Sequence, residues 1–162
     1  MRVAVRPFAA GDADGICDLI LPIQNEEFGL PITWEEQPDM ADIESYYCAG
    51  KGGFWVAVSG DRIVGSIALA ELSHGNCALR KMFVAADYRG SEFGIAASLL
   101  NILIARARDT DLSRVYLGTT TAFKAAHRFY EKHGFGRVDP ESLPEGFSRM
   151  KADTRFYLLN LD

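Results

Sequence analysis

The chain has 162 residues, of which 48% are hydrophobic and 24% charged, and this predicts a single globular domain over residues 1–162 with a packed core. The longest apolar run, residues 95–105, is too short to span a bilayer, and the net charge of −5 argues against a nucleic-acid partner. Three widely spaced cysteines favour neither a disulfide framework nor a metal site. No apolar core typical of a signal peptide opens the sequence, so a cytoplasmic location is expected.

Charge is distributed unevenly along the chain. Residues 7–50 contain ten Asp or Glu and no Lys or Arg, whereas residues 78–133 contain nine Lys or Arg and five Asp or Glu. The first segment therefore favours cations and the second favours anions, although ordinary solvated helix faces would give the same pattern.

The apolar patterns of the first half predict a strand, two helices separated by a loop, and three strands that can pair in antiparallel order. These elements fall at residues 2–8, 10–23, 40–49, 54–59, 62–70 and 77–85. Asp12 is placed to cap the first helix, and Gly60-Asp61 is typical of a hairpin turn. The loop over residues 25–39 is expected to lie over a site.

The second half predicts a helix, a strand, another helix and two strands. They fall at residues 91–108, 114–118, 121–133, 135–138 and 154–161. Ser91 is placed to cap the long helix, and Gly134 is expected to end the next one in a left-handed conformation. The whole order, β-α-α-β-β-β-α-β-α-β-β, predicts a mixed α/β (α+β) fold built on one sheet.

A strand, a glycine-bearing turn and a helix follow one another over residues 79–100. Unpaired N–H groups at the start of such a helix, together with the helix dipole, attract phosphate oxygens. Gly90 and Gly94 allow the backbone to approach a ligand closely, and Arg89 adds a cation with bidentate reach. Neither the P-loop spacing nor the dinucleotide-binding spacing of glycines is present, so those two phosphate sites are excluded.

This stretch resembles the acetyl-CoA motif of the GNAT N-acetyltransferase superfamily. The resemblance is carried by Met82-Phe83-Val84, Tyr88-Arg89-Gly90 and Gly94-Ile95-Ala96. It implies a GNAT-like, mostly antiparallel central sheet flanked by helices, with acetyl-CoA as co-substrate. Four residues separate Arg89 from Gly94 where most members have two, which implies a lengthened turn.

The resemblance also implies which residues contact the cofactor. The backbone of Met82, Phe83 and Val84 would pair with the pantetheine arm, and Arg89 and Gly90 would lie at the phosphate turn. The pyrophosphate would be held by Gly94, Ile95, Ala96 and Ala97.

A second block, residues 121–135, resembles the family pattern that ends in Tyr, Gly and Phe, and here Tyr130, Gly134 and Phe135 occupy those places. Phe123 stands where the family usually has a cofactor-binding Asn, and Thr119, Thr120 or Thr121 could replace that contact. By this register Tyr130 would protonate the leaving thiolate, because a phenol is protonated at neutral pH and close to a thiol in acidity. From spacing alone Tyr130 would instead be a core tyrosine of an amphipathic helix.

No motif identifies the base. Glu26, Glu27, Glu71 and His74 fall where the resemblance places the acceptor pocket, and each could equally be a surface side chain. Glu27 and Glu71 are the two we expect to accept a proton through water or to bind a cationic substrate.

The predicted function is transfer of acetyl from acetyl-CoA to a primary amine of a small molecule or peptide, by direct attack in a ternary complex. The acidic segment favours a cationic amine, and Phe28 and Trp34 could line its pocket or simply cover the core. A weakly catalytic acyl-CoA-binding or sensing module is the alternative, and a longer acyl chain is also open. The apolar strand at residues 154–161 could pair two copies into a homodimer.

Overall fold

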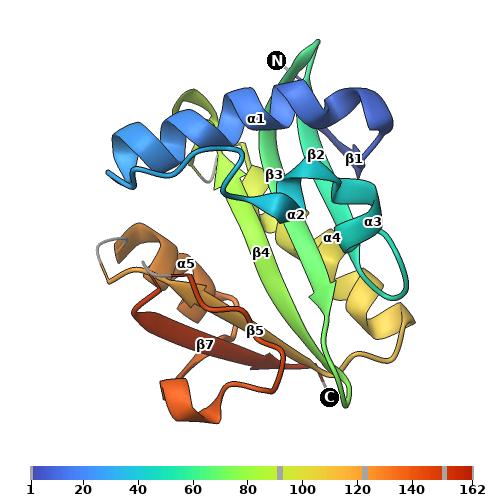
Figure 1. Ribbon diagram of the computed structural model, residues 1–162, viewed down its shortest axis with the longest axis vertical. Helices are drawn as coiled ribbons and strands as arrows, with labels where there is room; N and C mark the ends of the chain where they lie inside the picture. Colours follow the sequence, from blue (N-terminus) through green and yellow to red (C-terminus); the bar gives the residue numbers. More distant parts are fainter. Residues whose placement is uncertain (1, 91–92, 122–123, 151–152, 162) are drawn as a thin grey trace.

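The computed structural model describes residues 2–90, 93–121, 124–150 and 153–161, and the strands among them form one seven-stranded sheet (Figure 1). The strands are Ala4–Pro7 (β1), Gly53–Ser59 (β2), Arg62–Glu71 (β3), Asn76–Val84 (β4), Arg114–Thr119 (β5), Gly136–Val138 (β6) and Arg155–Asn160 (β7). They lie in the order β1-β2-β3-β4-β5-β7-β6, and only β4 and β5 pair in parallel. This mixed, mostly antiparallel sheet confirms the predicted fold class.

Helices cover both faces of the sheet. They are Ala13–Pro22 (α1), Pro38–Ala41 (α2), Ile43–Tyr47 (α3), Ile95–Asp109 (α4) and Lys124–Lys132 (α5). Figure 1 shows α1, α2 and α3 in front of the central strands and the yellow helix α4 behind them. The central strands β2, β3 and β4 therefore carry buried side chains on both faces, as their nearly unbroken burial shows.

The long helix α4 packs closely on the sheet through an apolar stripe. Its residues Leu99 and Leu103 have no exposed surface, and Ile95 begins the same stripe at helical spacing. A Cβ added to Gly65 of β3 would lie 3.1 Å from side-chain atoms of both Ile95 and Leu99. The missing side chain at Gly65 therefore lets the first turn of α4 approach the sheet, which fixes where that helix begins.

Three predicted helix features differ from the structure. The helix expected over residues 40–49 is split into α2 and α3 at Asp42, whose backbone is not helical and whose carboxylate accepts the Ser45 N–H at 3.1 Å. Asp12 does not cap α1, because its carboxylate instead accepts the Ala9 N–H and pairs with Arg6. The helix expected from residue 91 begins at Ile95, and the proposed cap Ser91 lies outside the described residues.

Two predicted turns are confirmed. β2 and β3 pair up to Ser59 and Arg62, with Gly60 at φ 60° in the connecting turn. Gly134 follows α5 at φ 95°, the positive region that ends many helices.

The last strand, β7, has a neighbour on each side. It pairs with β5 along six residues and with β6 along three, so its backbone is not an exposed edge. The reason for expecting a homodimer through this strand therefore falls away, and the sheet ends at β1 and β6 instead. Within the part of the chain that the structure describes, no helix has the length and apolar character needed to cross a membrane.

Candidate active site

The two parallel strands β4 and β5 begin side by side and then separate. Their pairing comprises three residue pairs, the last of which joins Ala78 to Tyr116. Beyond it β4 continues to Val84 alongside β3, while β5 continues to Thr119 alongside β7. The facing edges of these two strand ends have no strand partner in the described chain, so their backbone N–H and C=O groups can pair with an extended ligand.

A β-bulge lies in β4 where the strands separate. The register between β3 and β4 shifts between Ser66 and Ala68, and Lys81 opposite them has a φ of 52°. Ser66 Oγ donates a hydrogen bond of 2.7 Å to the Lys81 carbonyl, which stabilises this conformation. A left-handed non-glycine residue costs about 1–2 kcal/mol. Bulges of this kind redirect side chains and are frequent beside active sites.

The bulged residue carries its side chain into a buried polar network. Lys81 Nζ lies 2.9 Å from Gln37 Oε1 and 3.5 Å from a carboxylate oxygen of Asp39, which also accepts the Tyr47 hydroxyl. The side-chain amides of Gln24 and Gln37 exchange hydrogen bonds of 3.0 and 2.9 Å. Burial lowers the pKa of Lys81, and the nearby Asp39 carboxylate opposes that shift. The network ties the segment after α1, together with α2 and α3, to the middle of β4.

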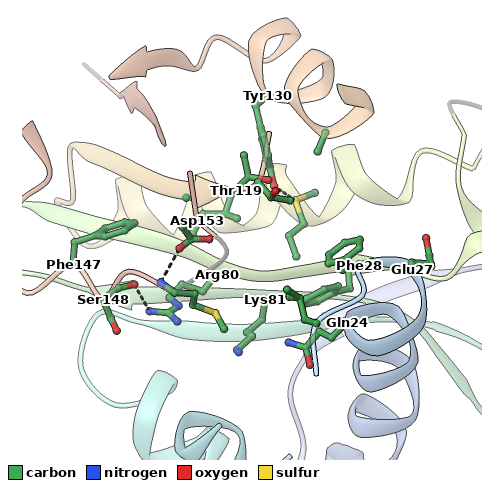
Figure 2. Close-up of a pocket in the computed structure, with 18 residues that line it drawn as sticks. Gln24, Glu27, Phe28, Arg80, Lys81, Thr119, Tyr130, Phe147, Ser148 and Asp153 are labelled. Carbon is green, nitrogen blue, oxygen red and sulfur yellow. Dashed lines mark hydrogen bonds between the residues drawn. The ribbon is translucent and has the colours of Figure 1, made fainter. Parts of the chain in front are cut away.

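A cavity of about 280 Å³ lies at the separation of β4 and β5. Its walls come from β4, the end of β5, α5, the segment after α1, and the loop before β7. The lining residues are Gln24, Glu27, Phe28, Leu30, Leu79, Arg80, Lys81, Met82, Phe83, Gly118, Thr119, Thr120, Ala126, Tyr130, Phe147, Ser148, Met150 and Asp153. Figure 2 shows Glu27 and Phe28 at one end, Arg80, Ser148 and Asp153 at the other, and Tyr130 between them.

Tyr130 reaches the middle of the cavity from α5. Its hydroxyl donates to Met82 Sδ at 3.7 Å, the dashed line beside Tyr130 in Figure 2. Its ring packs against Phe135 and Tyr157. Only 8% of the residue is exposed, and burial raises the pKa of the phenol well above its ordinary value. The phenol is therefore protonated at neutral pH, and a thioether is a weak acceptor that a stronger one can replace.

Glu27 and Arg89 bind one another beside the same cavity. Arg89 donates to both carboxylate oxygens of Glu27 at 2.7 and 2.8 Å, and its Nε donates to the Val84 carbonyl at 2.8 Å. Both side chains are about 40% exposed, at 39% for Glu27 and 42% for Arg89. The hydrogen bonds from Arg89 lower the pKa of Glu27. Glu27 belongs to a five-residue π-helical turn, Ile23–Glu27 (η2), which directly follows α1.

The start of α4 has the conformation expected of a phosphate-binding turn. Gly94 is its N-cap at φ 62°, and no atom lies within 4 Å of a Cβ built there. No side chain of a described residue caps the helix, and the first N–H groups of any helix lack an internal acceptor. Ala96 and Ala97 are half-buried, so the backbone there is covered only by small side chains. Gly90 also has a positive φ, of 119°.

The structure separates the two predicted bases. Glu27 lines the cavity, whereas Glu71 lies opposite Cys77 at the far end of β4, about 16 Å of strand from Met82. The Glu71 carboxylate accepts the Lys51 N–H at 3.0 Å. His74 lies in the turn that follows β3, and Glu26 is exposed, so neither lines the cavity.

The other predicted site residues also fall partly inside and partly outside the cavity. Phe28 lines the cavity, with its ring 6.1 Å from that of Phe83, while Trp34 packs against the core outside the cavity. Thr119 and Thr120 line the cavity at the end of β5. Phe123, the position of the missing family Asn, lies outside the described residues.

A histidine of α5 is buried beside the cavity wall. Only 5% of His127 is exposed. Its Nε2 lies 2.8 Å from the Thr120 carbonyl, and its ring lies 6.2 Å from that of Tyr157. The contact joins α5 to the end of β5 at the cavity wall.

Sequence reasoning missed the charged residues at the second end of the cavity. Arg80 is half-buried on β4, and its NH1 lies 3.4 Å from the Ser148 carbonyl. Asp153 accepts the Met150 N–H at 3.0 Å, and burial raises the pKa of its carboxyl group. The only sequence signal was the Arg80-Lys81 pair inside an apolar strand, because the loop before β7 matches no motif.

Comparisons with known proteins agree with this geometry. Residues 18–135 match the acetyltransferase (GNAT) family. N-acetylaspartate synthetase of Danio rerio is 40% identical over 124 residues, which cover 74% of this chain and 43% of that protein. The chain thus spans less than half the length of the curated relatives it matches.

Solved structures share the fold across the whole chain. An acetyltransferase of the GNAT family from Staphylococcus aureus Mu50 has a TM-score of 0.94 at 33% identity, covering 99% of this chain and 100% of that one. N-acetylglutamate synthase from Neisseria gonorrhoeae, in complex with coenzyme A and N-acetyl-glutamate, has a TM-score of 0.73. It covers 100% of this chain and 36% of that one, and its 19% identity shows the fold alone. The family match and the strand geometry confirm the resemblance and the predicted acyltransferase class, and the chain belongs to the acetyltransferase (GNAT) family.

Proposed function

We propose that this chain transfers the acetyl group of acetyl-CoA to the primary amine of a small molecule. The observation that carries the proposal is the separation of β4 from β5 around a cavity that holds the Tyr130 hydroxyl beside Met82. An acyl thioester laid along the free edge of β4 would bring its sulfur to this hydroxyl. Solved structures of the same fold in complex with coenzyme A support acetyl-CoA as the co-substrate.

The cofactor contacts follow from the strand edge and the helix start. The pantetheine arm would pair with the backbone of Met82, Phe83 and Val84, next to Thr120 across the gap. The pyrophosphate would lie on the turn at the start of α4 and on Arg89. The full set proposed for this phosphate site is Arg89, Gly90, Gly94, Ile95, Ala96 and Ala97. Phe123 remains a predicted cofactor neighbour.

The reaction needs no covalent enzyme intermediate. The amine nitrogen attacks the thioester carbonyl carbon, the carbon–sulfur bond breaks, and Tyr130 gives its proton to the departing thiolate. The proton lost by the amine passes through water to a carboxylate, for which Glu27 is the predicted base that borders the cavity. Backbone N–H groups of Phe83 or Val84 would stabilise the oxyanion. We no longer favour Glu71, because its distance from Met82 exceeds what one water bridges.

The acceptor is proposed to be a small molecule. N-acetylaspartate synthetase and N-acetylglutamate synthase are both named for N-acetylated amino acids, which supports an amine of that size. The predicted preference for a cationic amine depended on free carboxylates in residues 7–50. Two of those nearest the cavity are already paired, Glu27 with Arg89 and Asp39 with Lys81. Cationic preference, cytoplasmic location and dimerisation all stay predictions.

The test is thiol release by the purified protein from acetyl-CoA in the presence of acidic, neutral and cationic amines. Amine-dependent release, with the acetylated amine identified by mass, is the expected result. Tight acetyl-CoA binding with no release on any amine would instead favour the acyl-CoA-binding or sensing module. A preference for a longer acyl-CoA would keep the reaction and change the donor.

A further inference from the structure

Among the described residues, four charged side chains line the cavity, and two of them are already paired with an opposite charge. Glu27 is paired with Arg89, and Lys81 lies 3.5 Å from Asp39. Neither of those two partners lines the cavity. What remains along the wall is one cation, Arg80, and one anion, Asp153.

Arg80 makes no ion pair with a described residue. Within the described part of the chain, its one side-chain hydrogen bond goes to the Ser148 carbonyl at 3.4 Å, the outer limit for such a bond. A guanidinium group has five N–H donors in a planar fork, so most of its donor capacity is unused here. A carboxylate is the ligand group whose geometry matches that fork.

Asp153 is held in place but also forms no ion pair with a described residue. One of its carboxylate oxygens accepts the Met150 N–H. The same carboxylate packs against Gly118, where an added Cβ would lie only 2.8 Å from a carboxylate oxygen. Figure 2 shows Arg80 and Asp153 pointing toward the same end of the cavity from opposite walls. Two opposite charges that face the same part of a cavity without pairing can bind a ligand that carries both a positive and a negative charge.

The two ends of the cavity are suited to different substrates. Arg89, the proposed pyrophosphate ligand, joins Glu27 at one end, while Arg80 lies at the other end beyond Tyr130. Along β4, Arg80 precedes Met82 by two residues, which is about 6–7 Å of strand. A small amino acid and the Arg80 side chain together can bridge that distance to the thioester carbonyl.

We propose that the acceptor is an amine that also carries a carboxylate, an amino acid, with its carboxylate bound by Arg80 and its amino group directed by Asp153. This inference rests on the proposed acetyl transfer and names its second substrate. It replaces the cationic amine expected from the acidic segment, because Arg80 offers a partner for a carboxylate that such a substrate lacks.

The experiment compares amino acids with their primary amides, which keep the size and the amine but lose the carboxylate charge. Aspartate, glutamate and alanine are assayed for thiol release beside aspartic diamide, glutamic diamide and alaninamide, which carry no carboxylate, with agmatine as a cationic amine. We expect the wild-type protein to prefer an acid over its amide. Arg80→Gln should raise KM for the acid by about 10–100-fold and remove the preference for the acid over its amide, while KM for acetyl-CoA stays unchanged.

Arg149→Gln is the matched control. Arg149 follows Ser148 in the loop before β7, lies over the Phe156 ring at 4.9 Å, is exposed and does not line the cavity. Asp153→Asn should lower kcat with the acid while the ratio of acid to amide is kept, since the carboxylate site remains. An equal loss in both arginine variants, or a wild-type preference for amides or agmatine, would overturn the proposal.

A binding measurement separates this proposal from the proposed function. Calorimetry follows N-acetylaspartate, N-acetylglutamate and N-acetylalanine binding to protein saturated with coenzyme A, in wild type and Arg80→Gln. Absence of thiol release with every amine would refute the transferase, yet carboxylate binding that Arg80→Gln abolishes would still support this site. No binding of any of the three acids, or binding that Arg80→Gln leaves intact, refutes the site itself. Thermal unfolding of each variant shows that the fold is retained.

Discussion

Glu27 and Arg89 are 62 residues apart in the chain and form a bidentate ion pair at the edge of the cavity. The sequence predicted them for separate roles, one as a base and the other as a phosphate ligand. The same guanidinium N–H groups that hold the carboxylate would have to hold the pyrophosphate. An exposed ion pair of this kind contributes about 0–1 kcal/mol, so a more highly charged pyrophosphate can displace the carboxylate. Cofactor binding would then free Glu27.

Glu27→Gln should therefore affect the cofactor and the chemistry in opposite directions. Removal of the competing carboxylate is expected to lower KM for acetyl-CoA by up to about fivefold. Loss of a base is expected to lower kcat by about 100-fold. Steady-state kinetics at saturating amine measure both parameters.

Asp87→Asn is the control for that variant. Asp87 also binds an arginine through two hydrogen bonds, to Arg62 at 2.8 and 3.1 Å, but it does not line the cavity. Its kinetics should equal those of the wild type. An unchanged kcat in Glu27→Gln would remove Glu27 as the base, and a raised KM for acetyl-CoA would contradict the competition.

Tyr130→Phe should lower kcat by about 100-fold or more, because the departing thiolate loses its proton donor. The free energy of unfolding should barely change, since the lost hydroxyl donates only to a thioether at 3.7 Å. Burial holds the pKa of this phenol above its ordinary value, so the wild-type rate should show no loss from its ionisation up to pH 10. Tyr157→Phe, whose hydroxyl binds Glu131 outside the cavity, should keep its activity. Equal rates for wild type and Tyr130→Phe would exclude the proton-donor role.

Much of the fold could be predicted because its signals are local. The hairpin at Gly60 and the end of α5 at Gly134 each depend on a glycine with positive φ next to an apolar pattern. The break at Asp42 was missed because a side chain that caps Ser45 competes with continued helix, and periodicity does not register that competition.

The site could be predicted only where its residues are contiguous in the sequence. The strand and turn around Arg89 and the register of Tyr130 were read from contiguous motifs. The bulge at Lys81 depends on the partner strand and Ser66, and the pairing of Glu27 with Arg89 depends on α1 crossing to the end of β4. Arg80 facing Asp153 likewise joins two distant segments, so no local pattern contained it.

Gly94→Ala and Gly60→Ala form a matched pair that tests the phosphate turn. Both glycines have a φ near 60°, and neither has an atom within 4 Å of an added Cβ. Each alanine should therefore cost about 1–2 kcal/mol of stability through backbone strain alone. Only Gly94→Ala should also raise KM for acetyl-CoA, because Gly94 caps the helix proposed to bind pyrophosphate. Equal KM values in the two variants would place the pyrophosphate elsewhere.

Asp39→Asn tests the network beneath β4 by removing the counter-charge of a buried amine. Lys81 is 4% exposed in its side chain, so an unpaired ammonium there should cost about 3 kcal/mol, measured by urea unfolding at pH 7. Burial already lowers the pKa of Lys81 from 10.5, and the unfolded chain therefore binds more protons than the folded one between the two pKa values. Stability should consequently rise with pH toward 10.5, and more steeply in Asp39→Asn, whose amine loses its proton sooner. A deficit that stays constant from pH 7 to pH 10 would show that the cost comes from lost packing and hydrogen bonds rather than from the buried charge.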